Sequence, residues 1–224
     1  MTPLWIFGSG GHAKVVIDAA RASGLFEVVG VLDDDPSRRG MRVLEVPILE
    51  GISPEVVERC GIRHAIIAVG CNRARADLAR RLDGSILWAT VVHPTACLAS
   101  GVAVGEGSVV CAGAIVQPDA IIGRHVILNT ASSVDHDSHV GDFAHIAPGA
   151  RLAGGVRIGP GALIGLGSGI IPRCSVGAWA TVGAGGMVIR DIAPGITAVG
   201  IPARPVERTI SQAQNPIEDP LAGE

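Results

Sequence analysis

The sequence predicts a small N-terminal α/β domain followed by a parallel β-helix built from six-residue repeats. Two observations lead to this fold class. Every sixth residue from position 92 to position 188 is Val, Ile or Leu, with no break in register. Before residue 90, strand-like apolar runs alternate with helical segments, as in a parallel α/β sheet. The composition agrees: 48% of the 224 residues are hydrophobic but only 3% are aromatic, and 31 are glycine, which suits narrow, repeated layers.

The repeat region does not have the period of a helix or of an ordinary strand. Apolar residues recur every three or four positions in a helix and every two in a half-buried strand. A period of six fits a short strand plus a turn, repeated as one side of a prism, so that three sides make a coil of about 18 residues. The inward aliphatic side chains then stack in ladders, and burying each contributes roughly 1.5–3 kcal/mol. One coil cannot bury its own ladder, so we expect a stack several coils deep.

The N-terminal segment reads as strand, glycine-rich turn and helix. An apolar run over residues 4–7 leads into Gly8-Ser9-Gly10-Gly11-His12-Ala13, and helical spacing follows to residue 22. Backbone N–H groups at such a helix start hold phosphate, and acidic residues about 20 positions later accept hydrogen bonds from a ribose or a base. Asp33, Asp34 and Gly70 follow later strands. We interpret the segment as a nucleotide-binding domain; a purely structural turn is the alternative.

Bulk properties exclude several classes of protein. A net charge of −3 argues against nucleic acid as a partner. No uninterrupted apolar run is long enough to cross a bilayer, and the first residues lack the basic flank of a signal peptide. The five cysteines are scattered and form neither a disulfide framework nor a metal-type pair. We therefore expect a cytoplasmic protein with no membrane partner and no bound metal.

Several segments together resemble one known family. They are residues 6–16, Leu32-Asp33-Asp34, residues 69–72, Asn129 to Asp137, Gly141 to Ile146, and Gly200-Ile201-Pro202-Ala203-Arg204-Pro205. This set resembles the sialic-acid O-acetyltransferase (NeuD-like) family of hexapeptide-repeat sugar acetyltransferases, which includes the bacterial N-acetyltransferases of nucleotide-linked 4-amino-4,6-dideoxyhexoses. The resemblance covers roughly residues 4–206. It implies a left-handed β-helix, a homotrimer with active sites between subunits, and acetyl-CoA as the cosubstrate.

The resemblance also implies a domain organisation and a set of site residues. Residues 1–90 form a Rossmann-like domain for the nucleotide sugar, residues 91–206 the β-helix, and residues 207–224 a C-terminal tail. The catalytic base corresponds to His136 and its carboxylate partner to Asp137. The positions implied for acetyl-CoA are His145, Gly154, Leu166 and Ala184. The positions implied for the sugar nucleotide are Gly10, Gly11, His12, Asp33, Asp34 and Gly70.

The chemistry of acetyl transfer suits these residues. A 4-amino sugar is largely protonated near neutral pH, so a base must remove a proton before or during attack on the thioester. Histidine fits this role because its pKa lies near 6.5. The repeat places His136 two positions after the inward Val134, at a corner that faces outward, and Asp137 is positioned to fix its tautomer. The tetrahedral intermediate needs a further donor for its oxyanion, which we expect to be a backbone N–H.

Some residues and functions stay open at this stage. His12 either contacts a substrate phosphate or caps the helix, Trp179 projects outward next to a cofactor or a coil edge, and Arg80 and Arg81 belong to an ordinary helix surface. A sugar O-acetyltransferase uses the same fold and base. A γ-type carbonic anhydrase would need zinc held by histidines such as His136, His139 and His145. A non-enzymatic sensor is a third alternative. The nucleotide (UDP, GDP or dTDP) cannot be read from the residues.

Overall fold

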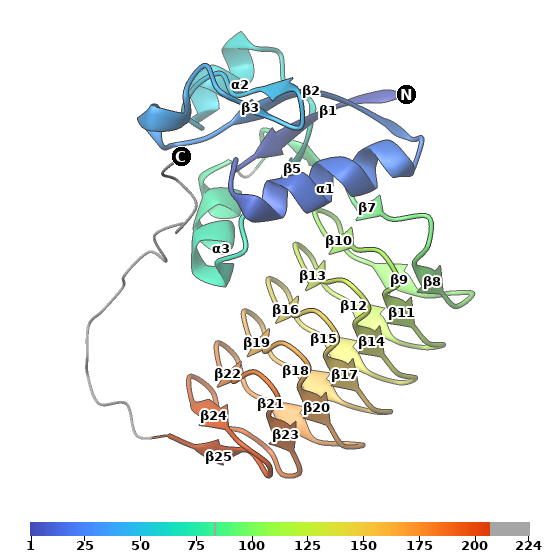
Figure 1. Ribbon diagram of the computed structural model, residues 1–224. Helices are drawn as coiled ribbons and strands as arrows, with labels where there is room; N and C mark the ends of the chain where they lie inside the picture. Colours follow the sequence, from blue (N-terminus) through green and yellow to red (C-terminus); the bar gives the residue numbers. More distant parts are fainter. Residues whose placement is uncertain (83, 207–224) are drawn as a thin grey trace.

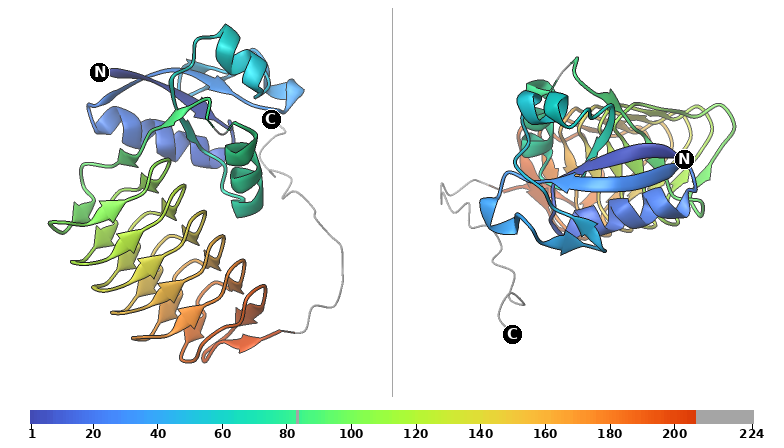
Figure 2. Two further views of the ribbon diagram at one scale, coloured as in Figure 1. Left: turned by 180° about the vertical axis from the view of Figure 1, so that it is seen from behind. Right: turned by 90° about the horizontal axis from the view of Figure 1, so that it is seen from above.

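The computed structural model describes residues 1–82 and 84–206, so the expected tail at 207–224 lies outside the described residues. Figure 1 shows a small α/β domain seated on one end of a long β-helix, and Figure 2 shows the same arrangement from behind and from above. The predicted fold class is therefore confirmed. None of the helices in the described part of the chain is long and apolar enough to cross a membrane.

The N-terminal domain is built on a four-stranded parallel sheet in the order β2-β1-β5-β6. Its strands are β1 (Thr2–Phe7), β2 (Phe26–Leu32), β5 (His64–Ile67) and β6 (Leu87–Trp88). Its helices are α1 (Gly11–Ala22), α2 (Pro54–Arg59) and α3 (Asn72–Arg81), with a 3-10 turn, η1 (Pro36–Arg38), and a short hairpin of β3 (Arg42–Val43) and β4 (Val46–Pro47). Because β1 lies between β2 and β5, the carboxyl end of β1 is a topological switch point, where ligands of open α/β sheets bind.

The β-helix has three faces. Face 1 contains β7 (Val91–Val92), β10 (Val109–Val110), β13 (Ile127–Leu128), β16 (His145–Ile146), β19 (Leu163–Ile164), β22 (Thr181–Val182), β24 (Thr197–Val199) and β25 (Arg204–Pro205). Face 2 contains β8 (Cys97–Leu98), β11 (Ile115–Val116), β14 (Ser133–Val134), β17 (Arg151–Leu152), β20 (Gly169–Ile170) and β23 (Met187–Val188). Face 3 contains β9 (Ala103–Val104), β12 (Ile121–Ile122), β15 (His139–Val140), β18 (Arg157–Ile158) and β21 (Ser175–Val176).

The register follows the period of the sequence. Up to β23, stacked strands are parallel and pair residues 18 positions apart, as in Ile115 with Ser133 and Ser133 with Arg151. At the C-terminal end β24 pairs with β22 at a spacing of 16 residues, and β25 is antiparallel to β24. The second residue of almost every strand is buried in one continuous core, together with the small residue two positions before it. The first residue of each strand therefore points outward. This alternation decides which side chains of the β-helix are available for chemistry.

The two domains share a hydrophobic core. Buried residues of α1, among them Val16 and Ile17, pack in one cluster with the outward residues Val91, Val109 and Ile127 of face 1. The next outward positions down this column are His145 and Leu163, because β13 pairs with β16 and β16 with β19. The outward residues of this column are therefore apolar where they contact α1, and the next one is a histidine.

Candidate active site

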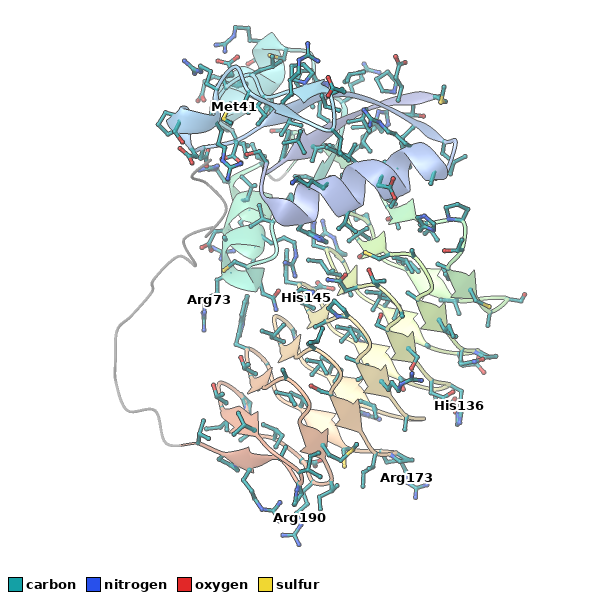
Figure 3. The ribbon with its side chains drawn as sticks, viewed as in Figure 1. Met41, Arg73, His136, His145, Arg173 and Arg190 are labelled. Atoms are coloured by element: carbon teal, nitrogen blue, oxygen red, sulfur yellow. The ribbon has the colours of Figure 1, made fainter. Side chains whose placement is uncertain are left out.

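His136 lies on the edge between faces 2 and 3, called here the 2–3 edge and formed by residues 135–137, 153–155, 171–173 and 189–190. Its side chain is 61% exposed, and its Nδ1 is 2.7 Å from Oδ2 of Asp137. Figure 3 shows His136 projecting from the β-helix at this edge. A neutral imidazole that donates through Nδ1–H keeps its lone pair on Nε2. The pair therefore presents Nε2 as a proton acceptor to the outside.

The backbone at this corner explains why the two side chains meet. Corner residues of the coils adopt a left-handed conformation, and most of them are glycine; in this coil the position is Asp137, with φ 58°. A non-glycine residue there is tolerated best when it is Asp or Asn, and it still carries a modest conformational cost of the kind found at functional sites. Asp135 helps from the other side, since its Oδ1 accepts a hydrogen bond from the His136 N–H at 3.0 Å.

The His136 ring packs directly against the backbone of Gly154. A Cβ atom at this position would lie only 2.6 Å from both Cε1 and Nε2 of the ring. His136, Asp137 and Gly154 line the same hollow of about 400 Å³, together with Arg173, which lies two coils beyond His136. The structure thus brings together the predicted base, its partner and one of the positions predicted for acetyl-CoA.

The hydrogen bond that Nδ1–H of His136 donates to Asp137 raises the pKa of His136 above its ordinary value, with the charges of Asp135 and Asp137 adding to the effect. We therefore expect Asp137→Asn to lower the pKa of His136, so that the acid limb of the pH profile of kcat moves to lower pH. We also expect kcat to fall at least tenfold, because the ring loses the group that fixes its tautomer. Asp135→Asn is the matched control: it removes the same charge without touching the ring, so its shift should be smaller. Steady-state rates from pH 5 to 9 measure both, and an unmoved acid limb in Asp137→Asn would contradict this.

The second group of predicted residues lies under the N-terminal domain. His12 stands in the first turn of α1, and its ring centroid is 6.4 Å from that of His145 on face 1. His145 Nε2 is 3.0 Å from Nδ2 of Asn129. Nε2 of His12 is buried with no hydrogen-bond partner among the described residues. The side chain of His12 does not cap α1, whose N-cap is Gly10.

The third group surrounds the switch point of the sheet. A cavity of about 360 Å³ is lined by residues at the carboxyl ends of the strands and on α3: Gly8, Asp33, Asp34, Ile52, Val69, Ala74, Asp77, Leu78 and Arg81. Oδ2 of Asp33 accepts a hydrogen bond from the Ser9 N–H at 2.6 Å and so holds the glycine-rich turn. Asp34 accepts from the Ile52 N–H at 2.7 Å and pairs with Arg81 at 2.7 Å. The expectation that Arg81 is an ordinary surface residue is therefore wrong, since it lines the cavity.

These groups are not all joined within one chain. His136, Asp137 and Gly154 lie on the 2–3 edge, whereas His12, Gly70 and His145 lie between α1, α3 and face 1. Gly10 and Gly11 begin α1 beside Asp33. Leu166 and Ala184 are exposed and follow face 1 strands, so they lie on the edge between faces 1 and 2. Figure 3 shows His145 and His136 well separated on the molecule.

Arg75, on α3, is the residue that sequence reasoning missed. It is only 1% exposed, and its guanidinium donates to the carbonyls of His125, Val69 and Phe143 at 2.8–2.9 Å. Longer contacts reach the carbonyls of Gly70 and Ala144. One side chain therefore ties the loop that carries Gly70 to the turn that precedes His145. The sequence gives only a weak indication that Arg75 is buried, namely its position on the same helix face as Ala76 and Ala79.

Two further contacts hold α3 on the β-helix. Nδ2 of Asn72 donates to the carbonyls of Gly161 and Ala162, each at 3.1 Å. The Arg73 guanidinium lies 4.8 Å from the ring centroid of Trp179, a cation–π contact. Trp179 thus packs at a coil edge against the N-terminal domain, which was one of the two interpretations left open by the sequence.

Three histidines lie in this junction, His125 buried and His12 and His145 half-buried, and removal from water is the first cause that lowers the pKa of each. The pKa is lowered to about 4 for His12, about 4 for His125 and about 3 for His145, with the charge of Arg75 contributing in all three. His125 is stacked on Phe143, 5.1 Å between ring centroids, and meets the edge of Trp88 at 4.9 Å. At neutral pH these rings carry no charge.

This burial predicts a loss of stability in acid. Since the folded pKa values lie below the unfolded value near 6.5, the unfolded chain binds more protons between these values. The free energy of unfolding should have its full value above about pH 6.5 and decrease as the pH drops towards 4. At pH 5 the decrease should be about 2 kcal/mol for each histidine. Urea unfolding at pH 7.5, 6 and 5 measures this. His125→Phe should reduce the dependence of the unfolding free energy on pH by about a third. A urea midpoint of the unaltered protein that does not change with pH would contradict the prediction.

No group of three or more His, Cys, Asp or Glu side chains in residues 1–82 and 84–206 is arranged to hold a metal ion. His136, His139 and His145 come from the 2–3 edge, face 3 and face 1 respectively, and do not converge within the chain.

Comparisons with known proteins agree with this architecture. The PglD N-terminal domain family matches residues 3–82. A histidine-to-asparagine variant of perosamine N-acetyltransferase from Caulobacter crescentus, solved with CoA and GDP-perosamine, is 38% identical over 92% of this chain and 98% of that one, with a TM-score of 0.86. The chain belongs to the hexapeptide-repeat sugar acetyltransferases of the PglD and PerB type. It is thus an acetyltransferase of a family whose members use acetyl-CoA.

Two other members of the family support the assignment. The acetyltransferase domain of PglB from Neisseria gonorrhoeae is 33% identical over 92% of this chain and all of that domain, with a TM-score of 0.84. UDP-N-acetylbacillosamine N-acetyltransferase of Bacillus subtilis is 38% identical over 118 residues. That match spans about half of each protein, 47% of this chain and 49% of the relative.

Proposed function

We propose that the protein transfers the acetyl group of acetyl-CoA to the 4-amino group of a nucleotide-linked 4-amino-4,6-dideoxyhexose, with His136 as the general base. The observation that carries the proposal is the exposed His136–Asp137 pair, whose Nε2 is free to take a proton. Two of the relatives named above support it: one is a perosamine N-acetyltransferase bound to CoA and GDP-perosamine, and the other is a UDP-N-acetylbacillosamine N-acetyltransferase.

The proposed reaction needs no acyl-enzyme, because the thioester is already activated. The neutral sugar amine attacks the thioester carbonyl, and a C–N bond forms. Nε2 of His136 takes the proton that the amine nitrogen loses, and Asp137 stabilises the imidazolium. As the tetrahedral intermediate collapses, the C–S bond breaks and the imidazolium returns the proton to the departing sulfur. The free enzyme is regenerated with a neutral imidazole, an acetamido sugar and CoA.

The nucleotide end of the substrate is assigned to the N-terminal domain. The cavity at the switch point has the position expected for a nucleotide, and its walls carry Asp33, Asp34 and Arg81. The glycine-rich turn held by Asp33 leads directly into α1, whose N–H groups are placed to meet a phosphate. Gly10, Gly11, His12 and Gly70 complete this side of the proposed site.

The activity is tested by thiol release from acetyl-CoA, measured with a chromogenic disulfide, across GDP-, UDP- and dTDP-linked 4-amino sugars and free sialic acid. We expect one nucleotide amino sugar to support turnover and its product to carry an amide, identified by mass spectrometry. Thiol release with sialic acid alone would favour the O-acetyltransferase. If no acceptor raises thiol release above the rate without acceptor, the proposal fails.

We further propose a homotrimer in which His136 of one subunit serves the nucleotide cavity of another. Support comes from the distribution of the groups: one chain places the base on the 2–3 edge, away from the cavity and from His12 and His145. We expect light scattering to give the mass of a trimer. We also expect His136→Asn subunits, co-expressed with Asp33→Ala subunits, to recover activity that neither variant has alone. A mixed preparation as inactive as both parents would contradict shared sites.

A further inference from the structure

Arg75 contacts two parts of the proposed acceptor site at once. Its Nη1 donates to the carbonyl of Val69 at 2.8 Å, and Val69 lines the nucleotide cavity. The same nitrogen lies 3.3 Å from the carbonyl of Gly70. Nη2 donates at 2.8 Å to the carbonyl of Phe143, in the turn that leads into His145. One buried side chain therefore fixes how far the wall of the cavity stands from the His145 ring.

The hydrogen bonds around His145 fit only one tautomer of its ring. Oδ1 of Asn129 accepts from the Thr130 N–H at 2.8 Å, so the amide nitrogen of Asn129 faces the ring and lies 3.0 Å from its Nε2. An amide nitrogen can only donate, so Nε2 is the acceptor and Nδ1 carries the proton. Burial is the main cause that lowers the pKa of His145, and a hydrogen bond with the Gly70 backbone opposes it, as expected when Nδ1–H donates to a carbonyl.

Arg75 and His145 therefore meet at the carbonyl of Gly70. The Arg75 side chain is only 1% exposed, so water cannot take the place of its donors. Lysine would keep the charge, but its single ammonium group cannot reach the loop and the β-helix together as the planar guanidinium does. Without the guanidinium, the Gly70 carbonyl is free to move and the His145 proton loses a fixed acceptor. The tautomer of His145 thus depends on Arg75.

A buried polar atom beside His145 points to a ligand. Nε2 of His12 has no hydrogen-bond partner among the described residues, and the His12 ring centroid is 6.4 Å from that of His145. An unpaired buried nitrogen is costly unless a ligand completes it. His12 lies in the first turn of α1, next to the N–H groups assigned to the phosphate, where the hexose of a nucleotide sugar would follow. Both rings are uncharged at neutral pH, which suits hydroxyl groups.

We propose that Arg75 is a positioning residue of the acceptor site. It holds the Gly70 carbonyl at a fixed distance from the nucleotide cavity and keeps His145 in the Nδ1–H tautomer. His12 and His145 then bind hydroxyl groups of the hexose. This inference rests on the proposed function. Arg75 itself does not touch the substrate, so its loss should weaken the affinity that the sugar adds and spare the affinity that the nucleotide supplies.

Calorimetry on the full-length protein measures these two contributions separately. GDP, UDP and dTDP are titrated first, followed by the 4-amino-4,6-dideoxyhexose derivative of the diphosphate that binds, in the absence of acetyl-CoA. We expect Arg75→Lys to weaken binding of the nucleotide amino sugar about tenfold, the effect of one or two lost hydrogen bonds. Binding of the free diphosphate should change by less than about threefold. Both proteins are compared at a temperature where circular dichroism shows them folded.

A second measurement needs no substrate. In protein labelled with nitrogen-15 histidine, long-range proton–nitrogen correlations show which ring nitrogen of His145 carries the proton, and His145→Gln identifies its signals. We expect Nδ1–H alone in the unaltered protein and a mixture of the two tautomers in Arg75→Lys. A role of Arg75 in stability alone would leave the tautomer of the folded variant unchanged.

Arg73→Gln is the matched control, because it loosens the same helix at Trp179 and leaves the hydrogen bonds of Arg75 in place. It should keep both affinities within about twofold and the His145 tautomer unchanged. Equal weakening of diphosphate and nucleotide amino sugar by Arg75→Lys, an unchanged tautomer, or the same losses in Arg73→Gln would overturn the inference. If the unaltered protein binds no nucleotide amino sugar, the proposed function fails and the inference fails with it; an unchanged tautomer in Arg75→Lys beside normal acetylation by the unaltered protein rejects the inference alone.

Discussion

His136→Asn is expected to lower kcat by about 10²- to 10⁴-fold, the usual contribution of a general base. Asparagine keeps a polar group where Nδ1 meets Asp137, 2.7 Å away, but offers nothing at the position of Nε2. The proton of the amine must then go to water. Because the substitution leaves the nucleotide cavity intact, we expect KM for both substrates to change by less than about threefold.

The pH profile distinguishes loss of a base from loss of structure. In the unaltered protein kcat should rise with pH through the raised pKa of His136, since only the neutral imidazole accepts a proton. In His136→Asn this acid limb should disappear from the residual activity. His93→Asn is the control, because the side chain of His93, at the start of the β-helix, forms hydrogen bonds only with Thr95 among the described residues. More than a tenth of the original kcat in His136→Asn would show that another group takes the proton.

The sequence could predict His136 because the period of the β-helix fixes the direction of every side chain. Once Val134 is assigned to the core, the next corner must face outward, and Asp137 is adjacent in the chain. The ladder pairings confirm that register from strand to strand. Local periodicity therefore carries enough information for the fold and for a site made of neighbouring residues.

The junction between the domains could not be predicted in the same way. His12 and His145 are far apart in the chain, and their proximity depends on how α1 lies over face 1. Leu166 and Ala184 were grouped with Gly154 by resemblance, although they lie on the edge between faces 1 and 2 and Gly154 lies on the 2–3 edge. Arg75 carries a charge, so patterns of hydrophobicity place it in solvent. Only the docking of α3 buries it.

That buried guanidinium gives the second large effect. Arg75→Met is expected to destabilise the protein by about 3–5 kcal/mol, because several buried carbonyl groups lose their only side-chain donor at once. Methionine fills much of the volume but leaves the carbonyls of His125, Val69 and Phe143 without their donors. Each buried acceptor left unpaired costs about 1–3 kcal/mol.

The charge itself is not what stabilises the junction. Burial lowers the pKa of Arg75 to about 10, and among residues 1–82 and 84–206 no carboxylate lies within 4.0 Å of its guanidinium. Its partners are the amide oxygen of Asn72 and backbone carbonyls, so the geometry of the guanidinium fork decides the outcome. Arg75→Lys retains the charge but not the fork, and we expect it to recover less than half of the loss. A lysine that restored full stability would show that charge alone suffices.

Urea unfolding of Arg75→Met, Arg75→Lys and the control Arg80→Met measures these differences. Arg80 lies on the same helix but is 72% exposed and pairs with Asp77 on the surface, so its loss should change the free energy of unfolding by less than about 1 kcal/mol. If the junction is the weak point, Arg75→Met should also separate the transition of the N-terminal domain from that of the β-helix, because α3 has lost the side chain that joins Val69 and Gly70 to Phe143 and Ala144. A single transition at the original midpoint would mean that Asn72, Arg73 and the apolar contact of α1 hold the domains together without Arg75.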